Sequence, residues 1–476
     1  MPGVGLNVSD RRLPSDKMFF SVYTLGCKLN QLETEAIAGS FCREGFVLVS
    51  EAKTKPDIIL VNTCTVTSMA EQKARRIIRK ALREQSQAFI IVTGCYAQME
   101  APSLAALDGG SGRLFVIPGD MKDRLLDLPS FLAQAIPMKI SGNSVSSVVK
   151  NYFESLEPSE VSMEGAFRFA PETFTSHSRA FLKIQDGCDH RCSFCRVSLA
   201  RGANKSLAAK QVLSRLRSLE QLGFAEAVLT GVNISQYRDP QVQGFAELLD
   251  FLLKGTEKIR LRLSSIELEM QREGEFSLGD TFTDVIANHR IRPHFHLSLQ
   301  SGSSGILAKM GRAYSPADIV EFTSRLRRFR DDPFIACDII AGFPGETESD
   351  FKETLTLCEE IGFAWIHAFH FSPRPGTVAA GLSGKVSEKE KAQRVDILSE
   401  LARKGRTDYI RRWEGREVEA VVEAGGDAGF VPAVSENYLK LKIACADRPV
   451  PTPGSLVKCR ILRAEDSRFD AIAEMV

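Results

Sequence analysis

Short apolar runs that alternate with helical stretches are the feature that most limits how this 476-residue chain can fold. In residues 18–140 the runs are Met18–Leu25, Asp57–Val61 and Phe89–Val92, and a stretch with helical spacing follows each of them. Runs this short and this apolar are typical of strands buried on both faces of a parallel sheet. We therefore predict a doubly wound α/β sheet of flavodoxin type over residues 18–140.

A second series of apolar runs suggests a barrel. Six runs alternate with helical stretches: Phe181–Ile184, Ala227–Thr230, Arg260–Ser264, Phe295–Leu299, Ile335–Ile340 and Trp365–Phe371. Eight strand–helix units close into a full barrel, so six units predict a partial (β/α)6 barrel over residues 176–405. Ligands of such barrels bind at the carboxyl ends of the strands.

The loop after the first of these six runs carries Cys188, Cys192 and Cys195 within eight residues. Cysteine thiolates are soft ligands that select iron–sulfur clusters, zinc or copper(I). A cubane iron–sulfur cluster usually takes four cysteines, but no other cysteine lies between Cys95 and Cys337. We therefore expect a cluster that leaves one iron open to a small molecule.

A structural zinc ion is the alternative, with His190 as its fourth ligand. His190 lies inside the first gap between the cysteines, whereas zinc ligands more often pair across gaps of two residues. The cluster is the favoured prediction.

Three further cysteines each come directly after an apolar run of the N-terminal sheet: Cys27, Cys64 and Cys95. The carboxyl ends of parallel strands share one edge, so these cysteines are expected to converge although they lie far apart in sequence. They predict a second three-cysteine cluster. Cys42, which falls in a helical stretch, is interpreted as a small buried hydrophobic residue.

The C-terminal residues 406–476 show alternation with a period of two. The runs are Val418–Val422, Phe430–Val434, Leu439–Ile443, Leu456–Leu462 and Phe469–Met475, with Gly and Pro turns between them. This pattern predicts a small antiparallel barrel. Residues 141–175 are rich in Ser, Glu and Pro and are interpreted as a linker.

The cysteine loop at 188–195 matches the signature of the radical S-adenosylmethionine (SAM) family. Within that family, Gly26–Glu35, Asn62–Thr67 and Thr93–Gln98 resemble the N-terminal domain of the methylthiotransferases, and the resemblance extends over essentially residues 18–476. It implies that the C-terminal barrel is a TRAM domain, which binds RNA. It also implies two 4Fe–4S clusters: a radical-forming one on Cys188, Cys192 and Cys195, and an auxiliary, sulfur-carrying one on Cys27, Cys64 and Cys95.

Segments at the predicted carboxyl ends of the barrel strands resemble the SAM-binding motifs of the same family. The residues expected to contact SAM are Phe194, Gly231, Asn233, Glu267, Gln300, Gly302 and Arg312. Glycine lets the backbone approach a ligand, and the polar side chains can pair with the amino, hydroxyl and carboxylate groups of SAM. His294 and His296, on either side of one strand residue, are interpreted as structural.

The motifs Lys28–Gln31 and Asn62–Thr67 most resemble the branch that acts on N6-threonylcarbamoyladenosine at position 37 of tRNA. This resemblance implies methylthiolation of carbon 2 of the adenine with two SAM molecules, one donating a methyl group to sulfur and one yielding the radical. The implied partners are tRNA, an electron donor protein and a sulfur source. We expect no catalytic residue beyond the cluster ligands, because an aromatic C–H has no proton that an acid–base residue could usefully remove.

Three alternatives remain open at this point. Within the same fold, the substrate would be N6-isopentenyladenosine in tRNA or an aspartate of a ribosomal protein. In a different class, the chain would be a metal-bearing RNA-binding protein without catalysis.

Composition bears on partners and compartment. The 61 Lys and Arg residues nearly balance the 60 Asp and Glu residues, so any RNA-binding surface must be local. One helical face carries the candidates Arg76, Arg79, Lys80 and Arg83, and a solvent-exposed face without RNA contacts is the equal alternative for it. Near the C-terminus the candidates are Arg411, Arg412 and Lys440. Lys28 and Arg196, beside predicted ligands, are candidates for contacting the threonylcarbamoyl group.

The sequence also suggests a cytoplasmic protein without a membrane segment. Met1–Lys17 has no apolar core of a leader, and no run approaches the roughly 18 apolar residues of a membrane span. Eleven cysteines, an odd number, do not resemble the disulfide framework of a secreted protein.

Overall fold

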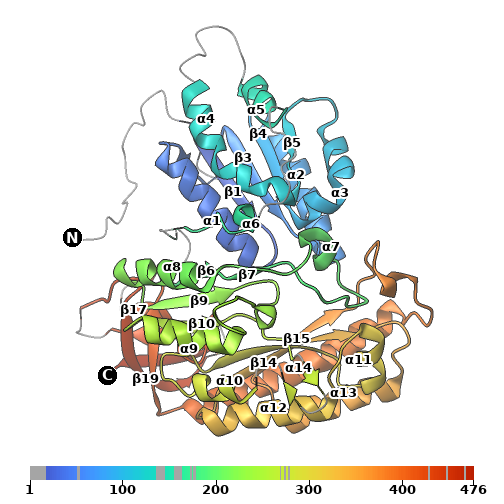
Figure 1. Ribbon diagram of the computed structural model, residues 1–476, viewed down its shortest axis with the longest axis vertical. Coiled ribbons are helices and arrows are strands. Elements are labelled where there is room, and N and C mark those ends of the chain that lie inside the picture. Colours follow the sequence, from blue (N-terminus) through green and yellow to red (C-terminus); the bar gives the residue numbers. More distant parts are fainter. Residues whose placement is uncertain are drawn as a thin grey trace. The chain divides into compact units, whose positions relative to one another are not determined.

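The computed structural model of the chain (Figure 1) divides into two compact units. It describes residues 18–50, 54–135, 145–154, 163–171, 174, 178–268, 270–272, 275–276, 279–426, 429–445, 449–465 and 468–476. The smaller unit comprises residues 1–26, 33–64 and 69–162, and the larger unit comprises residues 27–32, 65–68 and 163–476. The expectation for Met1–Lys17 and much of the predicted linker (141–144, 155–162, 172–173 and 175) lie outside the described residues.

The smaller unit contains a five-stranded parallel sheet. Its strands are β1 (Phe19–Thr24), β2 (Val47–Leu48), β3 (Ile58–Thr63), β4 (Phe89–Gly94) and β5 (Leu114–Val116). They pair in the order β2-β1-β3-β4-β5. This is the strand order of flavodoxin-like folds, which confirms the predicted fold class. The two-residue strand β2 is too short to give a recognisable sequence pattern.

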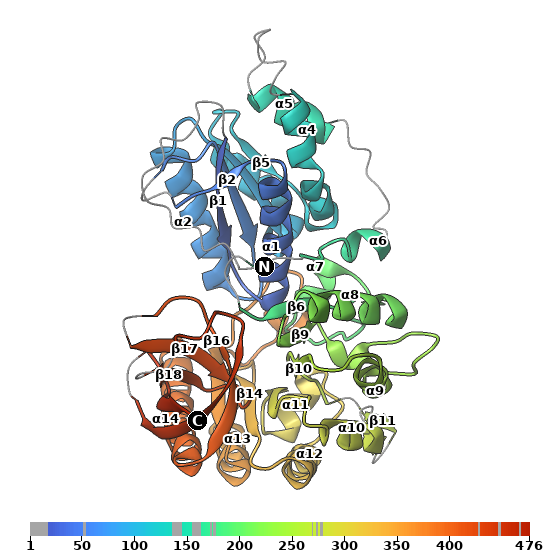
Figure 2. The same cartoon turned by 90° about the vertical axis from the view of Figure 1, so that its left-hand side faces the viewer.

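Helices cover both faces of this sheet (Figure 2). They are α1 (Lys28–Arg43), α2 (Ser68–Glu84), α3 (Cys95–Ala105), α4 (Leu128–Ala135) and α5 (Val145–Glu154), with 3-10 helices η1 (Ala106–Asp108) and η2 (Gly119–Leu126). On one face, Ile59 and Val61 of β3 pack in a cluster with Ile78 of α2. On the other face, the rings of Phe20 and Phe41 lie 5.0 Å apart, which seats α1 against β1.

Two details of the smaller unit differ from the sequence interpretation. Cys42 is exposed rather than buried, because it lies on a different face of α1 from Phe41, which packs on the sheet. Helix α5 falls within the segment interpreted as a linker, and the rings of Phe131 in α4 and Tyr152 in α5 lie 4.9 Å apart. The few apolar residues of α5, such as Val149 and Tyr152, share one face, so a weak overall pattern still forms a packed helix.

The larger unit contains the six predicted barrel strands: β6 (Ala180–Lys183), β9 (Glu226–Thr230), β10 (Arg260–Leu263), β13 (His294–Gln300), β14 (Phe334–Ala341) and β15 (Trp365–His370). They form two parallel three-stranded sheets, β10-β9-β6 and β13-β14-β15. Parallel bridges between Leu261 and Ile291 and between Ile266 and Leu297 join the two sheets. The prediction of a six-stranded partial barrel is thereby confirmed.

Helices cover the outer face of these strands (Figure 1). They are α8 (Ala209–Gln221), α9 (Phe245–Gly255), α10 (Gly279–Ile286), α11 (Ser304–Met310), α12 (Pro316–Phe329), α13 (Glu348–Ile361) and α14 (Glu388–Trp413). Helices α12, α13 and α14 each begin with a capping box, in which a Ser or Thr and the acidic residue three positions later bond to each other's backbone N–H. Apolar side chains of strands and helices form one continuous core between the two layers.

Short elements complete this part of the chain: α6 (Met163–Ala166), β7 (Gln185–Asp186), α7 (Val197–Arg201), β8 (Lys205–Ser206), η4 (Ile234–Gln236), β11 (Met270–Arg272), β12 (Glu275–Phe276) and η5 (Val378–Gly381). Among the helices of the described residues, none combines the length and the apolar content needed for a bilayer span.

The C-terminal strands form a closed five-stranded barrel. They are β16 (Glu417–Val422), β17 (Phe430–Ser435), β18 (Lys440–Ala444), β19 (Leu456–Ala464) and β20 (Ala471–Met475), in the order β16-β17-β18-β20-β19. The expectation of a purely antiparallel barrel needs one correction, since β18 and β20 pair in parallel. Strand β19 lies between β18 and β20 in the sequence and is antiparallel to β20, so β20 runs in the same direction as β18. Helix α14 runs through the predicted boundary at 405/406, so the small barrel follows its end without a linker.

Ionised side chains buried in the larger unit join the two barrels. Glu226 of β9 pairs with Arg262 at 2.6 Å and with Arg292 at 2.8 Å, and all three side chains are fully buried. Arg292 reaches Glu419 of β16 at 2.9 Å. Arg262 also donates to the backbone carbonyl of Ser435 at 2.9 Å. The small barrel is therefore packed onto the partial barrel through charge-assisted hydrogen bonds.

Candidate functional site

The cysteine loop at 188–195 begins where β7 ends and is held by backbone hydrogen bonds. Gly187 has a φ of 69°, and a side chain at this position would collide with the backbone of Ala203, so glycine is required. The Cys188 N–H donates to the Gly202 carbonyl at 3.0 Å, and the Cys195 N–H donates to the Cys192 carbonyl at 3.1 Å. These bonds fix the loop that carries the three thiols.

The thiols of this loop are partly buried, and they lie near enough to interact electrostatically. Burial raises the pKa of the Cys188 thiol to about 11, and the thiols of Cys192 and Cys195 act in the same direction. Three thiolates here would repel one another unless positive charge lies among them. A bound metal centre supplies that charge, which is why metal binding and loss of thiol protons go together.

The spacing of the thiols favours a cluster over a single ion. Cysteine ligands of one zinc ion, at about 2.3 Å from the metal, lie roughly 4 Å apart. Among the described residues, one group of three side chains has ligand atoms within 4.8 Å of one another, and it consists of His190, Cys192 and Glu267. Since Cys188 and Cys195 are not in that group, the three thiols are spread more widely than the ligands of one zinc.

Glu267 is engaged in other interactions, which further weakens the zinc alternative. Its carboxylate accepts from the Asn233 amide at 2.7 Å and forms an ion pair with Arg312, whereas His190 Nδ1 lies 3.8 Å away. The Nε of Arg312 is buried and has no hydrogen-bonding partner among the described residues. A buried donor without a partner is costly, so this position fits a ligand that accepts hydrogen bonds, as the carboxylate of SAM does.

Phe194 and Gln300 are also predicted to contact SAM. Phe194 lies near Arg312, and Gln300 lies at the end of a strand. The guanidinium of Arg312 is 5.7 Å from the ring centroid of Phe194, which places this predicted residue beside the same charge. Gln300, the last residue of β13, has a φ of 73°, an uncommon conformation for a residue with a side chain. Such backbone strain concentrates at ligand sites.

The two predicted glycines have a packing role in the structure. A Cβ at Gly231 would lie 2.7 Å from Gln185 Oε1, and one at Gly302 would lie 2.6 Å from the Thr354 Cα. Protein atoms therefore fill the space beside both glycines. Their place in SAM binding stays a prediction.

The carboxyl ends of β1, β3 and β4 are joined side by side in the smaller unit. The Leu25 N–H donates to the Asn62 carbonyl at 2.9 Å, and the Thr63 hydroxyl donates to the Thr93 carbonyl at 2.6 Å. Gly94 has a φ of 104°, and a Cβ there would lie 2.6 Å from Asn62 Oδ1. The strand ends are thus closely packed.

Cys27, Cys64 and Cys95 follow these three strand ends in turn. Cys64 and Cys95 are buried, whereas Cys27 is exposed. Adjacent strands of a sheet lie about 4.8 Å apart, a spacing that suits cysteines sharing a multi-iron cluster. Cys64 and Cys95 follow adjacent strands of one sheet edge, which fits the predicted second cluster, and the place of Cys27 in it stays a prediction.

The basic candidates fall into two groups. Arg76, Arg79, Lys80 and Arg83 are exposed on α2, and with Glu84 they line a recess of about 430 Å³. Near the C-terminus, Arg411 and Lys440 are exposed, but Arg412 donates twice to the carboxylate of Asp332, at 3.0 and 3.1 Å. Arg412 therefore has a structural partner already. Arg196 is buried, at 5 % exposure, and Lys28 is partly buried.

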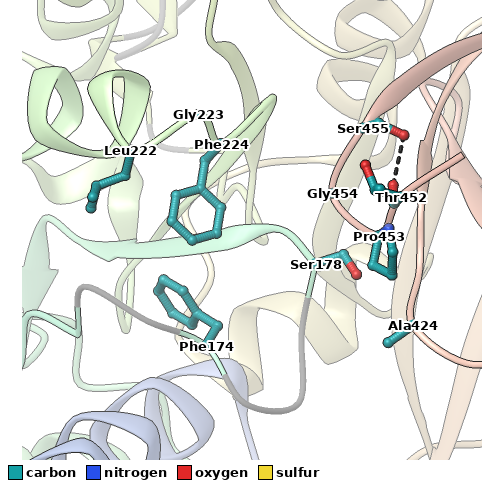
Figure 3. A pocket seen from close by; sticks show the side chains of 10 residues that line it. All are labelled: Phe174, Ser178, Leu222, Gly223, Phe224, Ala424, Thr452, Pro453, Gly454 and Ser455. Carbon is teal, nitrogen blue, oxygen red and sulfur yellow. Dashed lines mark hydrogen bonds between the residues drawn. The ribbon is translucent and has the colours of Figure 1, made fainter. Parts of the chain in front are cut away.

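A cavity of about 480 Å³ lies between the turn after α8 and the loop before β19 (Figure 3). Figure 3 shows the rings of Phe174 and Phe224 on one side and Thr452–Ser455 on the other. Its lining contains none of the cysteines and none of the residues predicted to contact SAM. This cavity is separate from the candidate site.

Comparison with known proteins agrees with the geometry. The model described as "Radical SAM superfamily" matches residues 182–358, and the one described as "Uncharacterized protein family UPF0004" matches residues 19–112. With six parallel strands and a three-cysteine loop at their carboxyl end, the protein is a radical SAM enzyme.

Curated relatives narrow the class. The chain is 39% identical to threonylcarbamoyladenosine tRNA methylthiotransferase MtaB of Treponema pallidum, with 92% of this chain and 97% of that protein covered. It is 33% identical to the protein of the same name from Thermotoga maritima, with 88% and 90% covered. The chain belongs to the radical SAM methylthiotransferases, a family of sulfur-group transferases whose cofactors are SAM and two 4Fe–4S clusters.

A relative from the isopentenyladenosine branch is also similar. The chain is 31% identical to tRNA-2-methylthio-N(6)-dimethylallyladenosine synthase of Syntrophus aciditrophicus, with 86% of this chain and 84% of that protein covered.

Proposed function

We propose that this protein methylthiolates carbon 2 of N6-threonylcarbamoyladenosine at position 37 of tRNA. One observation carries the proposal: a single chain places two three-cysteine sets at the carboxyl ends of parallel strands. The chain is 39% identical to the Treponema pallidum relative named for the threonylcarbamoyl substrate and 31% identical to the Syntrophus aciditrophicus relative named for the dimethylallyl substrate, which supports that choice of substrate.

In this proposal Cys188, Cys192 and Cys195 hold the radical-forming cluster, and Cys27, Cys64 and Cys95 hold the auxiliary one. When bound, these cofactors supply one-electron cleavage of SAM and a sulfur atom for transfer. Polar side chains orient SAM: the buried Nε of Arg312, which follows helix α11, donates to it, and Glu267 and Asn233 fix the position of Arg312 through their mutual bonds.

The substrate assignment is tested by competition between two tRNA anticodon stem–loops, one with N6-threonylcarbamoyladenosine and one with N6-isopentenyladenosine. Leaving a buried carboxylate or hydroxyl unpaired costs about 1–3 kcal/mol each, so a site built for them should favour its own substrate by at least roughly tenfold. Mass spectrometry of the product nucleosides after reaction with the reconstituted enzyme gives the ratio. A preference for the isopentenylated RNA would assign the protein to the other branch.

The basic face of α2 is proposed to bind the tRNA backbone. Replacing Arg76 and Arg79 by alanine should weaken tRNA binding several-fold and lower the slope of log affinity against log salt by about 1 for each phosphate that is no longer neutralised. The matched control replaces Lys210 and Lys352, which are exposed on α8 and α13, by alanine. Filter binding at a series of salt concentrations measures both quantities. Equal reductions of tRNA affinity in the two double variants would show that α2 acts only through its positive charge and is not a specific binding surface.

The remaining partners follow from the chemistry. Reductive cleavage of SAM requires an electron donor protein, and each turnover consumes sulfur, so a sulfur source must resupply the auxiliary cluster. We expect the protein in the cytoplasm, where tRNA is available. The small C-terminal barrel is proposed to act as a TRAM-like RNA-binding module, with Arg411 and Lys440 among its exposed cations.

A further inference from the structure

Polar side chains occupy the inner face of β13, β14 and β15, opposite to the helices. Leu297, Cys337 and Ile366 are buried in the core that these strands share with the outer helices. Since side chains alternate along a strand, the neighbouring His296, Asp338 and His367 point to the other face. Asp338 and His367 stand directly opposite each other in the register of β14 and β15. Together with Ser265, these three residues form a cluster that is called the inner polar patch.

Three of the four residues of the patch, Ser265, His296 and Asp338, form a hydrogen-bonded chain. Ser265 Oγ lies 2.9 Å from His296 Nδ1, and His296 Nε2 lies 3.1 Å from Asp338 Oδ1. A carboxylate only accepts hydrogen bonds, so the proton of His296 is on Nε2 and donates to Asp338. The side chains of His296 and Asp338 remain 18% and 22% exposed. His296 therefore fixes the carboxylate of Asp338 without covering it.

His367 is oriented as a neutral donor. Trp365 Nε1 donates to His367 Nδ1 at 3.2 Å, which places the proton of the imidazole on Nε2. Loss of hydration beside neighbouring residues and the imidazole of His296 lower the pKa of His367 below its ordinary value, so the ring is uncharged at neutral pH. The patch thus offers an anionic acceptor at Asp338 beside an N–H donor at His367.

An aromatic surface accompanies these polar groups. Trp365, His367 and Phe369 lie on the same face of β15, and the rings of His367 and Phe369 are nearly parallel, with an interplanar angle of 18° and centroids 6.4 Å apart. Phe369 is 42% exposed, which is high for a phenylalanine in a barrel strand. Exposed aromatic rings are the usual stacking surface for unpaired bases.

A ligand for this surface needs an aromatic ring that carries hydrogen-bond donors and acceptors. An N6-threonylcarbamoyl group has N–H and hydroxyl donors together with carbonyl and carboxylate acceptors, whereas an isopentenyl group has neither kind beyond its N6–H. Apolar side chains would be expected at these positions in a site for the isopentenyl group, since unpaired buried polar groups are costly.

We propose that Asp338 and His367 bind the polar N6 substituent of the substrate adenosine and determine substrate specificity. Asp338 accepts from the N–H or hydroxyl groups, and His367 Nε2 donates to the carbonyl or carboxylate, which keeps that carboxylate away from Asp338. His296 and Ser265 are positioning residues, because they act through Asp338. This inference rests on the proposed function and names the groups that would select its substrate.

The test measures binding of three anticodon stem–loops that differ only at N6 of adenosine 37: threonylcarbamoyl, isopentenyl and unmodified. Fluorescence anisotropy with the reconstituted full-length protein gives each Kd. The wild type should bind the threonylcarbamoyl RNA at least about tenfold more tightly than the unmodified RNA. In His367→Phe and Asp338→Asn that ratio should fall to about 1–2, with the affinity for unmodified RNA changed less than about twofold.

Two further variants separate recognition from structure. His367→Gln keeps an N–H donor and should retain part of the preference. His370→Phe changes an exposed histidine of the same strand whose side chain points to the other face of β15, and it should behave as wild type. Because His367 is exposed, its variants test the proposal even if Asp338→Asn does not fold.

The outcomes are distinguishable. A wild-type preference for the threonylcarbamoyl RNA that persists in His367→Phe and Asp338→Asn overturns this inference and leaves the proposed function intact. A wild type that prefers the isopentenylated RNA overturns the proposed substrate, and the specificity role of the patch with it.

Discussion

Replacing Cys188, Cys192 and Cys195 together by alanine is expected to halve the iron and sulfide content of the anaerobically reconstituted protein, from about eight to about four of each per chain. Reductive cleavage of SAM and methylthiolation should both fall to background, because these three thiols are proposed to hold the radical-forming cluster. Iron and sulfide assays and chromatographic detection of 5'-deoxyadenosine measure these effects.

The matched variant replaces Cys27, Cys64 and Cys95 by alanine. It should also lose half of the iron, but it should still cleave SAM reductively while transferring no sulfur. Cys42→Ala, which changes an exposed cysteine outside both sets, should retain full iron content. Methylthiolation by the variant without Cys27, Cys64 and Cys95 would remove these three cysteines from the chemistry, and zinc in place of iron in the native protein would exclude both clusters.

Removal of the buried carboxylate at Glu226 is expected to have the largest effect on stability. Glu226→Ala leaves the guanidinium groups of Arg262 and Arg292 buried and partly unpaired, and breaking such a buried ion pair costs roughly 3–5 kcal/mol. The two tryptophans, Trp365 and Trp413, both belong to the larger unit, so their fluorescence during urea unfolding reports on it. The control is Asp250→Ala, which breaks an exposed pair with Lys254 and should cost less than about 1 kcal/mol.

The same network gives a pH dependence. Burial alone would raise the pKa of Glu226, but the guanidinium groups of Arg262 and Arg292 outweigh it and lower the pKa to about 2. A carboxyl group with a depressed pKa stabilises the folded protein above its unfolded pKa of 4.5, and this contribution is lost as the pH falls toward 2. The stability difference between wild type and Glu226→Ala should therefore shrink between about pH 4.5 and pH 2. A constant difference over that range would assign the effect to poorer packing instead.

Much of the fold can be predicted because the signals are local. The run Phe89–Val92 is apolar on both faces, as buried parallel strands require, and the run Ile335–Ile340 is apolar except for Asp338; the structure has β4 and β14 at these places. The residues that depart from the sequence patterns, and the exact ends of the helices and strands, depend on tertiary packing. The expectation that Cys42 is buried is wrong because α1 turns it away from the sheet, and the weak pattern of α5 does not show that Phe131 provides a packing partner for Tyr152.

The inner polar patch escapes sequence reasoning for a related reason. The sequence pattern favours a structural role for His296, and Asp338 is a single carboxylate within an apolar run. Neither residue is informative alone. Their roles follow from the pairing of β13 with β14 and of β14 with β15, which brings together residues about 40 and 30 positions apart.

The amino-acid sequence by itself determined the strand–helix units, the number of barrel strands and the position of each cysteine at a strand end, because side-chain periodicity and residue spacing are properties of neighbouring residues. The tertiary structure alone decided which side chains share a face. Glu226 meets Arg262 and Arg292, and His296 meets Asp338, only because separate strands lie in one register and expel water between them, and no local pattern encodes that register.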